Sequence, residues 1–232
     1  MEHLKVKVGG PYACFTRPEF SVERVSYDVM TPSAARGILE AIFWKPEFSY
    51  QVKEIWVLKE IRHFTLLRNE LSDRQKEGHP FFIEDKRQQR TARILKDVEY
   101  LIIANVVLRQ HAKEKSNSVD GYRDQFRRNV EKGRCYHQPY LGCREFAAWF
   151  KKPDRSEKPI EGLPESLGTM LFDRRYQVNP KQKELKFYRH ISRNKKEVVE
   201  GTADAVFFEA KLTDGKLIVP QEKYKEVEVP DA

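Results

Sequence analysis

The chain has 232 residues, of which 34% are charged, and 43 Lys and Arg residues outnumber 35 Asp and Glu residues to give a formal net charge of +8. A chain of this length can bury a core without metal or disulfide staples, and three cysteines without C-x-x-C spacing argue against a disulfide framework and a zinc site. There is no apolar signal core and no run near the roughly 18 apolar residues of a membrane span, so we expect a cytoplasmic protein with no membrane partner.

The basic balance favours a polyanionic partner, because each Lys or Arg that neutralises a phosphate releases condensed counterions. A soluble protein with a merely basic surface is an equal alternative on charge alone. The 14 Phe and 10 Tyr residues tilt the choice towards nucleic acid, because aromatic rings can stack on bases.

The first predicted elements are a strand and a helix. Apolar residues alternate with lysines over residues 4–8, which predicts a half-buried strand. Residues 16–30 have no helical period and are interpreted as an ordered loop. Thr31 is a good N-cap with Pro32 at the first helical position, and an apolar stripe then predicts a helix that Pro46 stops.

The middle of the chain predicts two long strands separated by a charged excursion. Residues 48–61 and 98–108 read as strands, and the second is apolar enough to be central. Charges dominate residues 63–93, where the F-F-I island at 81–83 could be one arm of a hairpin. The excursion is either a solvated loop or a finger that reaches over a ligand.

The stretch from 121 to 146 gathers arginines, tyrosines and a histidine. It predicts a basic helix that ends at Gly133, then a turn around Pro139, and then a strand that begins near Arg144 and finishes at Phe150. Such a grouping on a tight bend is how a site for an anionic, base-bearing ligand could be built.

The C-terminal part predicts a small antiparallel sheet. Strand-like runs occur at 168–172, 185–191, 205–212 and 217–219, and the Asp214-Gly215 pair is a strong hairpin signal. The order of elements gives an α+β protein, with a ferredoxin-like domain at residues 1–150, a small antiparallel β domain at 165–220 and a flexible tail at 221–232. The β-α-β-β-α-β order of the first domain is also that of RNA-recognition domains.

Five stretches together resemble one known family. They are Y-A-C-F-T-R-P-E at 12–19, V-E-R-V-S-Y-D-V-M-T-P-S-A-A-R-G-I-L-E-A-I-F-W-K-P at 22–46, R-N-E at 68–70, R-Q-Q-R at 87–90 and H-Q-P-Y-L-G-C-R-E-F at 137–146. On these motifs the chain resembles CRISPR-associated protein five of the type I-C systems, subtype c or d. The resemblance covers residues 4–150 well and the rest loosely.

The resemblance implies an endoribonuclease that cuts precursor CRISPR RNA at the base of each repeat hairpin without a metal ion. It also implies that the protein then stays on the 5′ handle as a subunit of the Cascade complex. The implied partners are CRISPR RNA, through its repeat hairpin and 5′ handle, and the backbone and large subunits of type I-C Cascade. No cofactor is implied.

This chain departs from the family at the catalytic positions that the resemblance implies. The family tyrosine before W-K-P corresponds to Phe43, and the family lysine-histidine pair corresponds to Gly121 and Tyr122. Phenylalanine and glycine cannot transfer protons, so either neighbouring residues do the work or the nuclease is weak or lost. The second alternative is a silent subunit that only holds the 5′ handle.

Three nearby residues are the candidate catalytic substitutes, namely Tyr122, His137 and Lys113. Tyr122 could exchange a proton if its pKa of about 10 were lowered, or it could orient the hydroxyl; it could equally be a stacking residue. His137 titrates near neutrality, although it could instead pin the turn before Pro139 by hydrogen bonding. Lys113 could supply a cation for the phosphorane, as could Lys115 or Arg123.

The candidate RNA-binding residues are mostly arginines in or beside the motifs, where they could contact phosphates or stack on bases. They are Arg17, Arg24, Arg36, Trp44, Lys45, Arg68, Arg87, Arg90, Arg123, Arg127, Arg128 and Arg144. A third function, a metal-dependent DNA nuclease, is disfavoured because no Asp, Glu and His residues cluster with ligand spacing.

Overall fold

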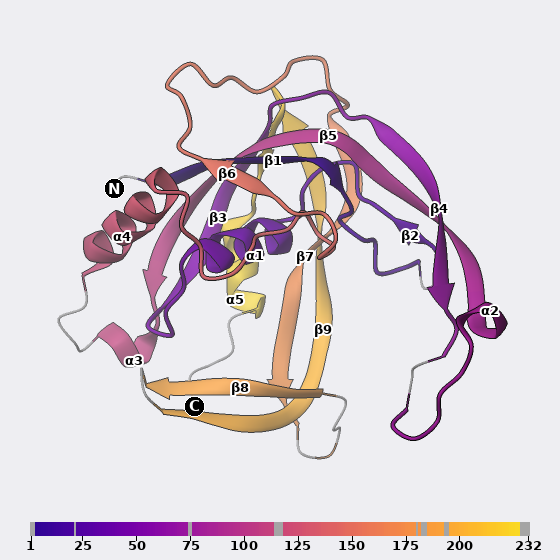
Figure 1. Ribbon diagram of the computed structural model, residues 1–232. Helices are drawn as coiled ribbons and strands as arrows, with labels where there is room; N and C mark the ends of the chain where they lie inside the picture. The colour runs from indigo at the N-terminus through magenta and orange to yellow at the C-terminus, as the bar shows by residue number, and fades with distance from the viewer. Residues whose placement is uncertain are drawn as a thin grey trace.

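The chain folds into one large, mainly antiparallel sheet with few helices, so the expected α+β class is confirmed (Figure 1). The computed structural model describes residues 3–227 except 21, 74–75, 114–117, 180, 182–184 and 193–194. The strands follow one another across the sheet as β6 (Trp149–Lys151), β1 (Leu4–Ala13), β5 (Arg87–Leu108), β3 (Phe48–Val57), β10 (Lys216–Ile218), β9 (Lys195–Thr213) and β7 (Ser166–Val178).

Three further strands pair beside this path: β2 (Arg24–Val25) and β4 (His63–Leu71) pair with β5, and β8 (Leu185–Ser192) pairs with β9. The helical segments are α1 (Pro32–Ile42), α2 (Ile83–Lys86), α3 (Gln110–Lys113), α4 (Val119–Glu131), the 3-10 turn η1 (Gln221–Lys223) and α5 (Tyr224–Val227). Within the described ranges, no helix is both long enough and apolar enough to cross a bilayer.

Helix α1 forms as its sequence predicts. The side chain of Thr31 accepts a hydrogen bond from the Ala34 N–H at 3.2 Å, and Pro32 occupies the first turn, where its missing N–H costs nothing. The apolar stripe is buried against β3 and β7. Phe43 is extended and ends the helix, which places residues 43–45 at its C-terminal end.

Helix α4 also forms as predicted, with a start two residues earlier at Val119. The side chain of Ser118 accepts from the Gly121 N–H at 3.3 Å, and Gly133 follows the helix with a φ of +61°. The strand predicted near Arg144 is wrong, because β6 begins only at Trp149. Residues 137–147 instead form a loop.

This loop is held against the end of β1. The Leu141 N–H donates to the Phe146 carbonyl at 2.8 Å, and the Cys14 N–H donates to the Leu141 carbonyl at 3.0 Å. Gly142 has a φ of +84°, and a Cβ there would lie 1.9 Å from the Cys14 carbonyl oxygen. Only glycine fits this approach, so the loop has no freedom to become a strand.

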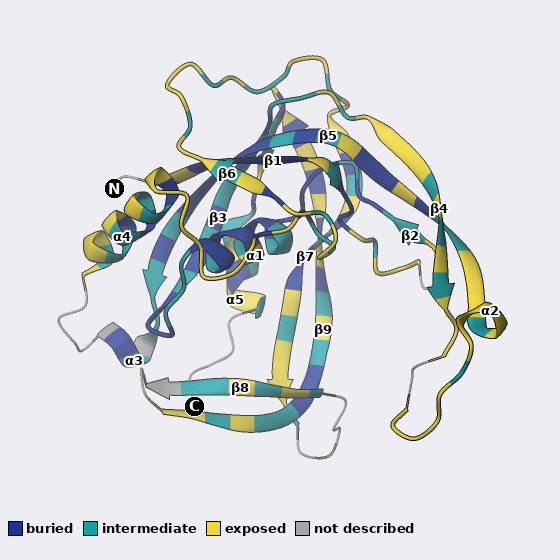
Figure 2. Cartoon of the chain, in the orientation of Figure 1, coloured by how far each residue is buried: buried dark blue, intermediate teal, exposed yellow. Residues whose placement is uncertain are grey.

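The charged excursion is a long hairpin whose arms differ from the predicted ones. Strand β4 pairs with the N-terminal half of β5, from His63 opposite Leu95 to Leu71 opposite Arg87. The F-F-I island forms no arm, because Phe82 precedes α2 and Ile83 begins it. The hairpin projects from the sheet with mostly exposed side chains (Figure 2).

The hairpin turn predicted at Asp214-Gly215 is present between the last two strands. Asp214 and Gly215 have φ values of +50° and +71°, as a two-residue hairpin turn requires, and β10 pairs with β9 across them. Residues 221–227 do not form the expected flexible tail: Tyr224 is buried, and its hydroxyl accepts from the Val52 N–H at 2.6 Å. Residues 228–232 lie outside the described residues.

The larger of two hydrophobic clusters runs through both halves of the chain. It includes Val6 and Ile55 of the N-terminal strands and Phe172 of β7. Strand β10 joins the two halves, because Leu217 pairs with Ile55 on one side and with Leu212 on the other. The sheet is therefore continuous from β6 to β7.

Candidate functional site

An open cleft of about 780 Å³ lies where the C-terminal end of α1 meets α4 and the segment after α4. Its lining therefore joins two parts of the chain that are far apart in sequence. The lining residues are Ile42, Phe43, Trp44, Lys45, Ser118, Gly121, Tyr122, Gln125, Arg128, Asn129, Arg134, Cys135 and Tyr136. We call this feature the cleft.

Aromatic rings form one wall of the cleft. The ring centroids of Phe43 and Tyr122 are 6.4 Å apart, and Phe48 packs between them at 5.7 Å from Phe43 and 4.8 Å from Tyr122. Phe43, Gly121 and Tyr122, the three positions at which the resemblance predicts the family catalytic set, line a single cavity.

Polar side chains of α4 form another part of the cleft. The Asn129 side chain donates to the Ile42 carbonyl at 3.3 Å, which fastens α4 to the end of α1. Gln125 donates to Asn129 at 2.9 Å and accepts from Arg128 at 2.8 Å. A bond to a neutral amide does not neutralise a guanidinium, so the exposed Arg128 keeps its charge for an anion.

The candidate catalytic residues lie at different distances from this cavity. Tyr122 lines it directly, whereas His137 is exposed and adjoins it through Tyr136, which does line it. The His137 and Tyr136 N–H groups both donate to the Ala41 carbonyl, at 3.3 and 2.9 Å, so this turn is held by its backbone. Lys113 ends α3, but its side chain is not described, and Lys115 lies outside the described residues.

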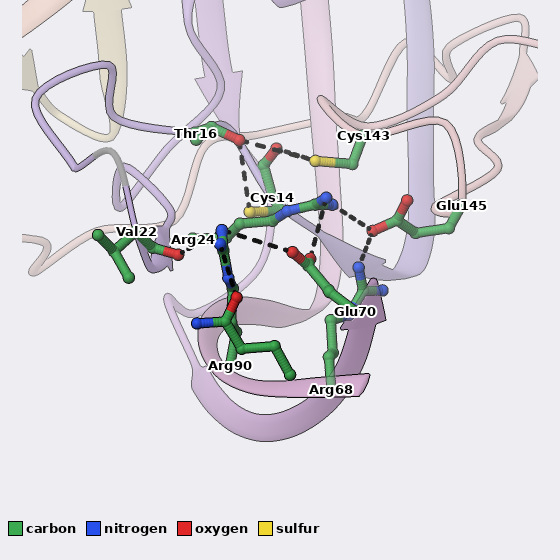
Figure 3. A network of polar contacts seen from close by, with 10 residues as sticks. Cys14, Thr16, Val22, Arg24, Arg68, Glu70, Arg90, Cys143 and Glu145 are labelled. Carbon is green, nitrogen blue, oxygen red and sulfur yellow. Dashed lines mark hydrogen bonds and ion pairs between the residues drawn. The ribbon is translucent and has the colours of Figure 1, made fainter. Parts of the chain in front are cut away.

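Three of the predicted RNA-binding arginines belong to a set of ion pairs at the base of the hairpin (Figure 3). Arg24 pairs with Glu70 at 3.1 Å and with Glu145 at 3.3 Å, and Arg68 pairs with Glu145 at 2.5 Å. Arg90 pairs with Glu70 at 3.7 Å. We call these five residues the arginine network, and its carboxylates already offset the positive charge.

Cys14, Thr16 and Cys143 lie beside this network (Figure 3). The Thr16 hydroxyl is 3.6 Å from the Cys143 sulfur and 3.8 Å from the Cys14 sulfur. A hydrogen bond from the Cys14 thiol lowers the pKa of Cys143, against burial, which raises it. The same contact, together with burial, raises the pKa of Cys14. The contact with Cys14 therefore makes Cys143 the more acidic thiol of the two.

Three other predicted RNA-binding arginines are engaged inside the protein. Arg36 forms a bidentate pair with Asp173 at 2.7 and 2.9 Å and a further pair with Glu40 at 2.7 Å. Arg123 is buried and pairs with Asp120 at 2.8 Å. Arg17 stacks over the Tyr27 ring at 4.4 Å.

The remaining predicted RNA contacts lie at the surface or in the cleft. Arg87 and Arg144 are exposed, and Arg127 pairs with Asp124 at 3.3 Å. Trp44 and Lys45 line the cleft with Arg128. The structure therefore brings three of the twelve predicted binding residues to the cavity, Trp44, Lys45 and Arg128, alongside the candidate Tyr122.

Two functional candidates escaped sequence reasoning. Tyr136 is 86% exposed and lines the cleft, where a base could stack on it, and its signal was present in the R-C-Y-H run. His190 touches Trp44 with ring centroids 5.4 Å apart. No local pattern could reveal that contact, because the two positions lie far apart along the chain. Among the described residues, no three His, Cys, Asp or Glu side chains gather to hold a metal ion.

Comparison with known proteins gives close relatives along nearly the whole chain. A Thermus thermophilus protein named CRISPR pre-crRNA endoribonuclease Cas5d is 53% identical over 227 residues, which are 98% of this chain and 95% of that protein. A Mannheimia succiniciproducens protein of the same name is 44% identical over 189 residues, covering 73% of this chain and 84% of the relative.

Two solved structures share the fold at lower identity. One is a functionally uncharacterized Streptococcus mutans protein, SMU1763c, with a TM-score of 0.63 and 19% identity over 98% of this chain and 96% of the other. The other is a CRISPR-associated protein with a TM-score of 0.63 and 22% identity over 96% and 94%. The model of the Cas_Cas5d family, described as CRISPR-associated protein (Cas_Cas5), matches residues 3–220, and the chain belongs to this family.

Proposed function

We propose that this chain is an endoribonuclease that cuts precursor CRISPR RNA at the base of the repeat hairpin, without a metal ion. It then stays on the 5′ handle as a subunit of type I-C Cascade, next to the backbone and large subunits. Two relatives that are 53% and 44% identical to this chain are named CRISPR pre-crRNA endoribonucleases, which supports the substrate and the reaction.

The observation that carries the proposal is the cleft itself. Phe43, Gly121 and Tyr122, where the resemblance predicts the family catalytic set, line one cavity with Arg128 and Lys45. Aromatic rings for bases and cations for phosphates thus surround a space of about 780 Å³, which accommodates a few nucleotides. A scissile phosphate bound there would lie among these groups.

The proposed reaction is a transesterification within the RNA. The 2′-oxygen of the nucleotide before the cut loses its proton and attacks the adjacent phosphorus, and the bond from phosphorus to the 5′-oxygen breaks. The products are a 2′,3′-cyclic phosphate and a 5′-hydroxyl, which takes up one proton. The protein must accept the first proton, supply the second and stabilise the phosphorane charge.

Three residues are proposed for these tasks. Tyr122 lines the cleft and either orients the 2′-hydroxyl or exchanges a proton with the RNA. His137 adjoins the lining residue Tyr136 and serves as acid or base. Lys113 supplies a cation: it ends α3, and the next described residue, Ser118, lines the cleft.

The proposed RNA contacts divide by position. Trp44, Lys45 and Arg128 contact the nucleotides at the cut, and the other predicted arginines contact RNA only outside the cleft. A subunit that merely holds the 5′ handle is the second candidate function. It is favoured by Phe43 and Gly121, because neither side chain can transfer a proton.

The experiment incubates the purified protein with its own repeat RNA in excess EDTA and resolves the products on a denaturing gel. We expect one cut at the hairpin base, which a 2′-deoxy substitution at the preceding nucleotide abolishes. Tight binding without a cut would replace the endoribonuclease by the handle-binding candidate. A cut that occurs only without EDTA would refute metal independence.

We further propose that residues 1–150 form a ferredoxin-like RNA-processing domain and residues 165–220 a small β domain. The strand order β6-β1-β5-β3, with α1 and α4 as the two crossover helices, supports the first part. The continuous sheet through β10 supports a fixed junction between the two domains.

The hairpin at residues 63–93 is proposed to contact a Cascade backbone subunit. Exposed apolar side chains on it support this role, with Leu67 at 62%, Phe82 at 77% and Ile83 at 61% exposure, because exposed apolar patches mark interaction sites. Deletion of residues 72–80 should weaken assembly while RNA cleavage persists. Unchanged assembly would refute this contact.

A further inference from the structure

Two histidines from distant parts of the chain meet beside the cleft. His111 lies in α3 and His190 in β8, and these two elements are in contact (Figure 1). The His190 and Trp44 rings pack in a T-shaped arrangement, with a centroid distance of 5.4 Å and an interplanar angle of 68°. Because Trp44 lines the cleft, this histidine pair lies at its rim.

Three of the four ring nitrogens of these histidines have no hydrogen-bond partner in the described part of the chain. The His190 Nδ1 atom and both ring nitrogens of His111 are buried there without a hydrogen-bond partner. Buried polar atoms in native proteins are normally paired, so each unpaired one calls for an explanation. A role that is completed only when a substrate binds is such an explanation.

The surroundings of His190 keep its ring neutral near pH 7. Burial lowers the pKa of His190, and so do the positive charges of Arg109 and Lys196 and the neighbouring His111, whereas Glu47 raises it. These groups come from α3, from β9 and from the segments flanking α3 and α1. A neutral imidazole can accept a proton, and Glu47 favours the charged form once it does.

We propose that His190 is a catalytic residue of the cleft, the general base that takes the proton from the RNA 2′-hydroxyl. It would thereby replace the proton-transferring side chain that the cleft lacks at Phe43 and Gly121. This inference rests on the proposed endoribonuclease function and adds to it a residue from the C-terminal strands.

The step balances within the RNA and the protein. The 2′-O–H proton moves to His190 as the 2′-oxygen bonds to phosphorus, and the bond from phosphorus to the 5′-oxygen breaks. The 5′-oxygen takes a proton from the Tyr122 hydroxyl, and the imidazolium then returns its proton through water to Tyr122. His111, whose helix α3 contacts β8, is proposed to position His190 rather than to contact RNA.

The test measures single-turnover cleavage of repeat RNA by His190→Gln and His190→Ala, with RNA affinity determined in parallel. We expect the rate to fall about 100-fold while affinity stays within about twofold of wild type, as for loss of a general base. Free imidazole should restore part of the His190→Ala rate. His3→Gln, an exposed histidine bound to Asn105, is the matched control and should cut normally.

The pH dependence of the cleavage rate distinguishes a general base from a residue with only a structural role, because loss of the latter would not change it. A general base must be unprotonated, so the wild-type cleavage rate should fall once the pH drops below the pKa of His190, which lies below the ordinary histidine value of about 6.5. This decrease in rate at low pH should be absent in His190→Gln. A His190→Gln variant that cuts at the wild-type rate, or loses rate only in proportion to affinity, would overturn the inference alone. A wild-type protein that cuts no RNA would overturn the proposed function and this inference with it.

Discussion

The cleft and the arginine network use the same residue type in opposite ways. In the network, Arg24, Arg68 and Arg90 face Glu70 and Glu145, so each guanidinium has a carboxylate beside it. In the cleft, Arg128 donates to the neutral amide of Gln125 and stays exposed. An arginine within a family motif can therefore hold the fold together, and its environment decides whether its charge is available to RNA.

The two regions also differ in how they keep their family features. The network keeps the motif residues, and with them a brace between β2, the hairpin and the loop at residues 137–147. The cleft is lined by Phe43 and Gly121 at positions where the resemblance predicts proton-transferring residues. We infer that the position of the reaction is preserved and that the groups performing it have moved.

The largest expected effect comes from Arg36, a predicted RNA contact on α1 that pairs with Asp173 of β7. Arg36→Met leaves Asp173 buried without its bidentate partner, so the free energy of unfolding should fall by about 3–5 kcal/mol. Urea denaturation measures this change. Exposed Arg87→Met is the control and should change stability by no more than about 0.5 kcal/mol. Equal stabilities for the two variants would make Arg36 a surface cation.

The second prediction returns the family residues to the cleft. Gly121→Lys combined with Tyr122→His should raise the single-turnover cleavage rate at least tenfold, because proton transfer by a positioned side chain is worth about 10²–10⁴. A Cβ at Gly121 has no neighbour closer than the Ser118 Cβ at 3.8 Å, so the lysine fits.

Gly37→Lys is the matched control for the added charge, since it places a lysine on the exposed face of α1, where a Cβ meets nothing within 4 Å. It should leave the rate unchanged. A folded double variant that cuts no faster than wild type would mean that the reaction takes place outside the cleft.

The third prediction separates the two kinds of arginine by salt dependence. Arg128→Gln should reduce the slope of log affinity against log salt by about 0.7, the value for one phosphate contact on single-stranded RNA. Arg90→Gln should leave the slope unchanged, because Glu70 already offsets that charge. Titrations of labelled repeat RNA at several salt concentrations measure both slopes. A slope reduced by Arg90→Gln and unchanged by Arg128→Gln would mean that the network, not the cleft, contacts phosphates.

The smallest expected effect lies in the network. Glu145→Gln weakens the ion pairs of Arg24 and Arg68, which are partly exposed, so the free energy of unfolding should fall by about 1 kcal/mol or less. RNA affinity should rise slightly at low salt, because Arg68 loses its counter-charge and Arg24 keeps only Glu70. Thermal unfolding and the same titrations measure these changes, and a loss of affinity would show that Glu145 positions the arginines for RNA.

Local patterns predicted the local elements of this fold. Thr31 with Pro32 gave the start of α1, Gly133 gave the end of α4, and Asp214-Gly215 gave the last hairpin, because each signal acts within a few residues. The arms of the excursion were placed wrongly, since the pairing of β4 with β5 joins partners from 16 residues apart, Leu71 and Arg87, to 32 residues apart, His63 and Leu95.

The site was harder to predict than the fold. Motifs predicted Phe43, Gly121 and Tyr122 as the family catalytic positions; the three residues line one cavity, and their role stays a prediction. The pairing of Arg36 with Asp173 and the contact of Trp44 with His190 join residues more than 130 positions apart. Such contacts depend on the finished tertiary structure and leave no trace in residue spacing.

The central claim is that the RNA is cut in the cleft. Repeat RNA carrying a 2′-deoxy sugar and a photoreactive 5-iodouracil at the nucleotide before the cut can be bound, irradiated and mapped by mass spectrometry. The account predicts crosslinks to Trp44, Tyr122 or Tyr136, whose rings line the cavity. Crosslinks confined to the hairpin at residues 63–93 or to the arginine network would contradict it.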